Sequence, residues 1–90
     1  MQESSNEIYI RCSNAVALAQ TMLRAKAVES VRLSDREEGL VVGTRTPVAV
    51  YQQLPQWMTE AYAQIHELRC SDDSLQALFS SLLQIHRGRV

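Results

Sequence analysis

Glycine is scarce in this 90-residue chain, and its three glycines stand apart at positions 39, 43 and 88. Phosphate-binding and dinucleotide-binding loops need glycines at close, fixed spacing, so the sequence predicts no nucleotide site of either kind. Cysteine is scarce too: Cys12 and Cys70 lie far apart and form no C-x-x-C pair or Cys/His ligand spacing. We therefore expect two reduced thiols, no metal site and no cofactor.

Neither sign of charge dominates, and long apolar runs are missing. Nine Lys and Arg residues are scattered among ten Asp and Glu residues, giving a formal net charge of −1, so the basic stripe of a nucleic-acid-binding protein is not seen. No apolar run approaches the roughly 18 residues of a membrane helix, and the polar first residues do not resemble a signal peptide. We expect a cytoplasmic protein with no nucleic-acid partner and no direct membrane insertion.

The composition that remains is that of a globular domain, with 46% apolar and 21% charged residues. A chain of this length can bury one core and little more. Residues 1–6 offer nothing to bury and are expected to form a disordered leader, which leaves residues 7–90 as a single domain.

Apolar periodicity predicts the elements of the first half of the chain. Alternation predicts a strand over residues 7–12. Three- and four-residue spacing then predicts a helix over 14–26, with Ser13 as its cap and Leu23 in its apolar stripe. Two short alternating runs follow and predict a hairpin whose polar loop ends in Gly39, a residue that tolerates a positive φ.

The second half continues the pattern. A Thr-Pro pair at 46–47 signals the start of a helix. Pro55 predicts a kink or a break inside that helix, because proline lacks the N–H that the helix needs. Alternation then predicts a strand over 65–70, with His66 on the same face as Leu68.

A last helix is predicted after the acidic turn 71–74, where capping side chains precede five large apolar residues in one stripe. The stripe consists of Leu75, Leu78, Phe79, Leu82 and Leu83. Because so apolar a stripe must cover something, we expect its first four residues to be interaction residues, in contact either with the domain's own sheet or with a partner.

The predicted order is strand, helix, strand, strand, helix, strand, helix. This order favours an α+β fold, a ferredoxin-like βαββαβ sandwich with sheet order 4-1-3-2 and an additional C-terminal helix. Two helices would cover one face and leave the other open, unless the last helix or a partner lies on it. Cys12 and Cys70 would then end neighbouring antiparallel strands at opposite ends of the sheet, too far apart for a disulfide.

No group of side chains in the sequence has catalytic spacing. Group transfer or hydrolysis needs a nucleophile beside a base, or paired carboxylates in different environments, and neither pattern stands out. His66 and Cys70 share a predicted strand face, but about 13 Å would separate them, which is too far for one metal ion. We expect a chain that works by binding, pairing or regulation and is not itself an enzyme.

From about residue 7 to residue 83, the chain resembles the accessory domain that follows the ATPase core in many bacterial ABC transporter ATP-binding subunits. In that family a strand and helix lead to a p-G-V-x-x-V turn, a hairpin, a helix, an I-x-x-I strand and a P-S-L-E-x-x-F helix start. The corresponding segments here are 27–31, the hairpin strands, 65–68 and 73–79.

Ser74, Leu75 and Phe79 fit the helix-start signature, whereas Asp73 and Gln76 stand where the family usually has Pro and Glu. The resemblance implies a non-catalytic accessory or regulatory domain, with ATP hydrolysis in a preceding part that carries the phosphate loop. It implies the ATPase core of the same protein as a partner, and a second copy as another. It also implies a cytoplasmic location, peripheral to the inner membrane through the parent transporter.

The main alternative is a free-standing ferredoxin-like small-molecule sensor or dimerisation module that binds its ligand at a paired interface. Such sensors usually need a glycine-rich loop between the first strand and the first helix, so that the ligand can approach the backbone closely. The loop at residues 12–15 contains no glycine.

Overall fold

The structure of the chain is a computed structural model, and it describes residues 6–34, 39–70 and 72–88. Its elements are β1 (Asn6–Cys12), α1 (Ala15–Leu23), β2 (Ser30–Leu33), β3 (Gly39–Thr44), α2 (Pro47–Ala61), β4 (Ile65–Cys70) and α3 (Asp73–Gly88). The predicted order of strands and helices is therefore confirmed. Residues 1–5 of the expected leader lie outside the described residues, and Asn6 is the first residue of β1.

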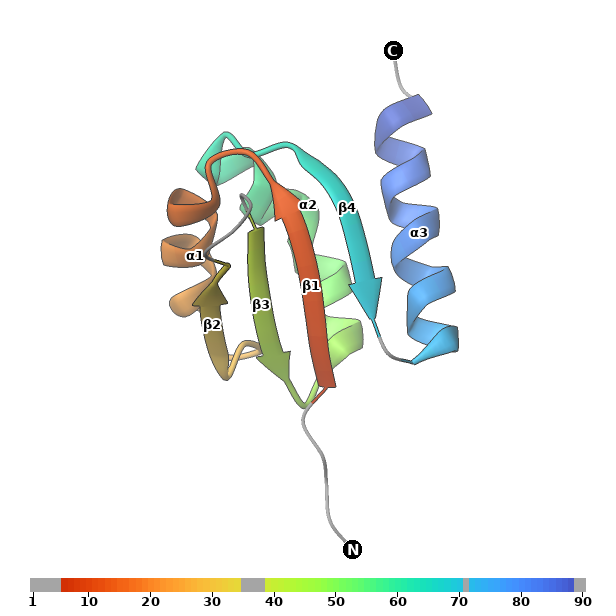
Figure 1. The fold of residues 1–90 in the computed structure, drawn as a ribbon, viewed down its shortest axis with the longest axis horizontal. Coiled ribbons are helices and arrows are strands. Elements are labelled where there is room, and N and C mark those ends of the chain that lie inside the picture. The colour runs from red at the N-terminus through yellow and green to blue at the C-terminus, as the bar shows by residue number, and fades with distance from the viewer. Residues whose placement is uncertain (1–5, 35–38, 71, 89–90) are drawn as a thin grey trace, which may run out of the picture.

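The four strands form one antiparallel sheet in the order β2-β3-β1-β4 (Figure 1). Read from the opposite edge, this order is β4-β1-β3-β2. The predicted α+β class is confirmed, and the sheet is compatible with a ferredoxin-like fold. In Figure 1, α1 and α2 lie behind the sheet, while α3 lies along β4, where it packs against both β4 and α2. Among the described elements, no helix covers the other face.

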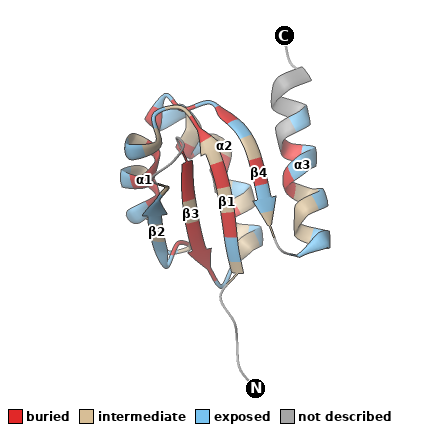
Figure 2. Cartoon of the chain, in the orientation of Figure 1, coloured by how far each residue is buried: buried red, intermediate tan, exposed pale blue. Residues whose placement is uncertain are grey.

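The core lies between the sheet and the two helices behind it, and Figure 2 shows its positions in β1 and β3 in red. Its fully buried residues include Ile8, Ile10, Cys12, Leu18, Met22, Leu40, Val42, Thr44, Val50 and Leu54. Thr44 is the polar member of this set. Its hydroxyl donates to the carbonyl of Ala27 and accepts from the amide of Thr46, so its burial leaves no unpaired polar group.

The start of α1 differs from the prediction, because Ser13 does not cap the helix. The Ser13 hydroxyl accepts from the amide of Gln64 at 3.0 Å, and the Ser13 amide donates to the Gln64 carbonyl at 2.9 Å. Asn14 takes the N-cap position with a left-handed φ of 50° and donates from its side chain to the carbonyls of Ala61 and Tyr62. These side chains tie the β1–α1 loop to the α2–β4 loop, a long-range contact that local spacing does not reveal.

The sequence predicts a kink or a break in α2. The break is wrong, because the helix is continuous through Pro55, and the kink stays a prediction. The predicted start is confirmed, with Thr46 at the N-cap and Pro47 at the first helical position. An internal proline costs a helix one hydrogen bond. Leu54 and Trp57 on either side of it are buried in the core, so tertiary packing holds the helix together at this point.

Gly39 is needed for a different reason from the one expected. It lies in β3 without a positive φ. A β-carbon added there would lie 3.0 Å from the hydroxyl of Tyr9 and 3.1 Å from the carbonyl oxygen of Ile10. The close approach of Tyr9 to the backbone therefore favours glycine here.

The face assigned to His66 is also corrected. A bulge shifts the pairing of β1 and β4, so that Cys12 pairs with Ile65 while Arg11 pairs with Glu67. The extra residue changes the phase of the strand. His66 is consequently exposed, while Ile65 and Leu68 are both buried.

Candidate binding surfaces

Three of the four interaction residues predicted on α3, namely Leu75, Phe79 and Leu82, pack on the core of the domain itself. Phe79 is fully buried and Leu82 nearly so, whereas Leu75 and Leu78 are half-buried. The Phe79 ring meets Tyr51 of α2 edge-on, with the ring centres 5.6 Å apart and the planes at 83°, a favourable aromatic geometry. Packing on the domain's own elements thus holds α3 in place. Contact of these residues with a partner stays a prediction.

The first turns of α3 also close the sheet at β4. Asp72 accepts from the first amides of the helix through its Oδ1 atom, which confirms the predicted acidic cap. One turn later, Gln76 Oε1 accepts from the amide of Cys70 at 2.6 Å, and Gln76 Nε2 donates to the carbonyl of Leu68 at 3.0 Å. The side-chain amide therefore pairs with β4 as a neighbouring strand would.

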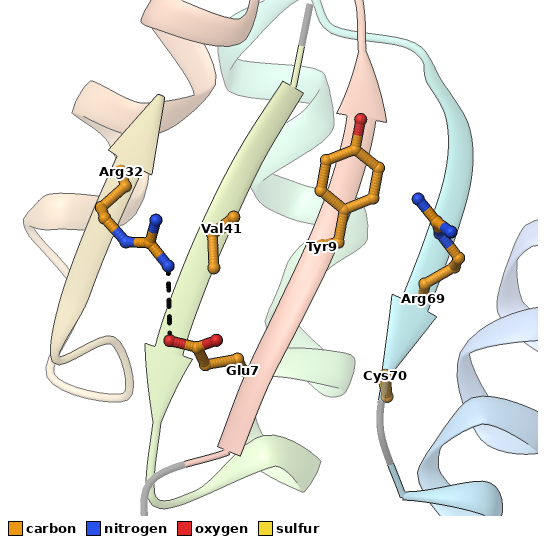
Figure 3. Close-up of a pocket in the computed structure, with 6 residues that line it drawn as sticks. All are labelled: Glu7, Tyr9, Arg32, Val41, Arg69 and Cys70. Carbon is orange, nitrogen blue, oxygen red and sulfur yellow. Dashed lines mark hydrogen bonds and ion pairs between the residues drawn. The ribbon is translucent and has the colours of Figure 1, made fainter. Parts of the chain in front are cut away.

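The uncovered face of the sheet carries a row of side chains that crosses all four strands. Arg32 pairs with Val41, Val41 with Tyr9, and Tyr9 with Arg69. Cross-strand partners point to the same face, and Figure 3 shows these four side chains in that order, with the Tyr9 ring seen face-on. The Arg69 guanidinium carbon lies 4.9 Å from the ring centre, a cation–π contact.

A hollow of about 310 Å³ lies along this row, and Glu7 and Cys70 complete its lining (Figure 3). On the same face of β3, the positions on either side of Val41 are Gly39 and Gly43. Because neither glycine has a side chain, Val41 is the residue of β3 that lines the hollow.

Charged groups surround the hollow in exposed ion pairs. Arg32 lies 3.4 Å from Glu7, and Glu67 contacts both Arg11 at 3.3 Å and Arg69 at 3.2 Å. The side chains of Arg32 and Arg69 are 65% and 63% exposed, so these pairs contribute little to stability. Each contact uses one nitrogen of a guanidinium group, and the other N–H groups remain able to bind a carboxylate or phosphate.

The described residues offer little for other kinds of chemistry. Among them, no three His, Cys, Asp or Glu side chains lie close enough to hold a metal ion. Cys12 and Cys70, both in the described part of the chain, are not joined by a disulfide. They lie at opposite ends of β1 and β4, as the predicted topology requires. Burial raises the pKa of the Cys70 thiol, and the nearby carboxylate of Asp72 raises it further.

A second surface lies at the β2 edge. Leu33 is 51% exposed, and its partner Leu40 is buried on the helix side of the sheet, so Leu33 points to that side as well. On α1, which packs against β2, Val16 and Leu23 are 56% and 60% exposed and lie two turns apart on one side of the helix. The buried residues of α1 face the sheet. Because the helix is right-handed, Val16 and Leu23 then lie on the side of α1 toward β2 and away from α2 (Figure 1). We call Val16, Leu23 and Leu33 the β2 flank.

Sequence reasoning predicted the open face of the sheet, but it missed the row of side chains on that face and the β2 flank. The alternation along β1 placed Tyr9 opposite the core, but only the register of the sheet shows that it lies between Val41 and Arg69 in this row. Leu23 was predicted in the buried stripe of α1 and is instead exposed. Helical spacing identifies an apolar side but does not reveal how far the sheet extends beneath it.

No protein-family model, curated protein or solved structure matches this chain. Within the described residues, none of the helices combines the length and the apolar character that crossing a bilayer requires.

Proposed function

We propose that this chain is a non-catalytic accessory or regulatory domain of an ABC transporter ATP-binding subunit, acting in assembly or regulation of the ATPase. The observation that carries the proposal is the way α3 is anchored. Phe79 is fully buried against Tyr51, and Leu75 packs against the core. Ser74 lies in the first turn, and its amide donates to the capping Asp72. The residues that fit the family's helix-start signature are thus the ones that begin and hold this helix.

A domain of this kind acts by contact with other proteins. The open sheet face offers Arg32 and Arg69 to acidic groups and Tyr9 to apolar or aromatic ones. Such a face fits an acidic segment of the ATPase core better than a membrane-inserted partner, since it carries three arginines and two glutamates. Attachment to the inner membrane would come only through the parent transporter.

The hollow on the open face favours the alternative, a small-molecule sensor. Against it stands the loop between β1 and α1. Ser13 and Asn14 bond this loop to the loop between α2 and β4. A ligand could reach the backbone there only by breaking those bonds, so the accessory-domain proposal accounts better for the loop.

The test begins with the genomic sequence upstream of Met1. We expect it to encode a phosphate loop in the same reading frame. The full protein would then be compared with a version lacking residues 7–88, and we expect its ATPase rate or its assembly with the membrane subunits to change. In calorimetry the isolated chain should give no heat with Mg-ATP, because it has no glycine-rich loop followed by Lys. Micromolar binding of Mg-ATP, or an upstream region without an ATPase, would contradict the proposal.

A further inference from the structure

We infer that two copies of this chain associate through their β2 strands, with the β2 flank of one copy packed on that of the other. The inference does not depend on the transporter context. It starts from the outward backbone hydrogen bonds of the two outer strands. At β4, Gln76 occupies an outward amide and an outward carbonyl. At β2, no described residue outside the sheet bonds to Val31 or Leu33.

The backbone of β2 is oriented for a further strand. The Ser34 amide donates to the Gly39 carbonyl across the hairpin. Because backbone groups in an antiparallel strand alternate in direction, Arg32 also faces β3, and the N–H and C=O of Val31 and Leu33 face outward. An exposed edge of this kind is a template for pairing with another chain. The strand holds no Pro and no bulge, and its one charged residue, Arg32, points to the open face of the sheet.

Exposed apolar surface adjoins this edge. Five large apolar residues are exposed in the part of the chain whose burial is described, and the three of the β2 flank lie on the β2 side of the molecule. Val16 and Leu33 lie at one end of the flank, near the start of α1 and the end of β2, while Leu23 lies at the other end. Exposed apolar side chains at both ends of this edge, together with its unpaired backbone groups, favour a protein contact over a solvated edge.

A second copy fits this surface because the flank is self-complementary. Two β2 strands paired antiparallel are related by a two-fold axis. The axis brings Val16 of one copy toward Leu23 of the other and the reverse, so apolar surface meets apolar surface at both ends. A single sheet would then run through both copies, with both open faces on the same side.

β2 has only four residues, so the interface is small, and we expect weak association, with a Kd of roughly 10 µM to 1 mM.

Sedimentation equilibrium of the full chain over this concentration range tests the inference. The wild type should dimerise, and Leu33→Lys should weaken the dimer by roughly tenfold or more, because a buried ammonium replaces a buried apolar group. Val48→Lys is the matched control, since Val48 on α2 is also 51% exposed but lies outside the β2 flank. It should leave the dimer unchanged. Leu23→Lys, on α1 rather than on the edge strand, should repeat the effect of Leu33→Lys.

Circular dichroism of each variant establishes that it is folded before its association is compared. A wild type that stays monomeric up to about 1 mM would overturn the inference. So would a dimer that Val48→Lys weakens as much as Leu33→Lys does, or one that persists in both Leu23→Lys and Leu33→Lys.

Discussion

At the β4 edge, the amide of Gln76 bonds to the strand and α3 packs against it, whereas at the β2 edge the outward backbone of Val31 has no such partner among the described residues. The two edges also differ in what lies beside them. Phe79 of α3, which packs beside the β4 edge, is buried, whereas Leu33 in β2 itself is exposed. One sheet thus has an edge closed by its own chain and an edge left for another chain.

The difference shows what the last helix does for this fold. The β4 edge would otherwise be as open as the β2 edge, and a four-stranded sheet with two open edges could pair at either side. Because α3 closes one edge, association through strands is directed to β2. α3 therefore stabilises the domain and also restricts strand pairing with another chain to the β2 edge.

Loss of the α3 anchor should have the largest effect. Phe79→Ala removes a fully buried ring and leaves a cavity beside Tyr51, so we expect the free energy of unfolding to fall by about 3–5 kcal/mol. Denaturant unfolding measures it, with Leu23→Ala as a control, because Leu23 is 60% exposed and should change stability by about 0.5 kcal/mol or less. A loss below about 1 kcal/mol for Phe79→Ala would show that α3 does not close the edge.

Gln76→Ala opens the polar part of the β4 edge while leaving the helix in place. It removes the partners of the Cys70 amide and the Leu68 carbonyl, and we expect a loss of about 1–3 kcal/mol in unfolding free energy. Gln84→Ala is the matched control, since Gln84 is exposed on the same helix. Equal effects of the two substitutions would mean that the Gln76 amide does not act as a strand.

The pH dependence of the unfolding free energy tests whether the Cys70 thiol is buried at the β4 edge. Burial, and then the Asp72 carboxylate, raise its pKa in the folded state, so the folded protein binds this proton more tightly than the unfolded chain does. The resulting stability is fully present below the ordinary thiol pKa and is lost as the pH rises through the raised value. The stability difference between wild type and Cys70→Ser should therefore be constant at neutral pH and shrink in alkaline solution. A difference that stays constant into the alkaline range would contradict burial at this edge.

Changes at the β2 edge should lower the unfolding free energy of the monomer the least. Leu33→Lys alters a half-exposed side chain at the end of β2, and below the dimerisation range we expect its unfolding free energy to stay within about 0.5 kcal/mol of the wild type. Thermal unfolding in dilute solution measures this. A large loss would mean that Leu33 belongs to the core and is not a contact for a second copy.

The fold was predictable where a single periodicity decides the outcome. Ile8 and Ile10 mark the inner face of β1, and Asp72 marks the start of α3. Each of these features can be recognised from residues close in sequence. The corrected or missed features depend on partners distant in sequence. Asn14 bonds to residues 61 and 62, and Gln76 completes the edge of a strand. No local pattern distinguishes those side chains from solvated ones.

Amide hydrogen exchange at the two edges, followed as a function of protein concentration, tests the central comparison most directly. The Cys70 amide, bonded to Gln76, should be protected at every concentration, because its partner belongs to the same chain. The Val31 amide should exchange rapidly in dilute solution and slow as the concentration rises through the dimerisation range. Rapid exchange of Val31 at all concentrations, or a concentration dependence at Cys70, would contradict the account of one closed edge and one edge that pairs with a second copy.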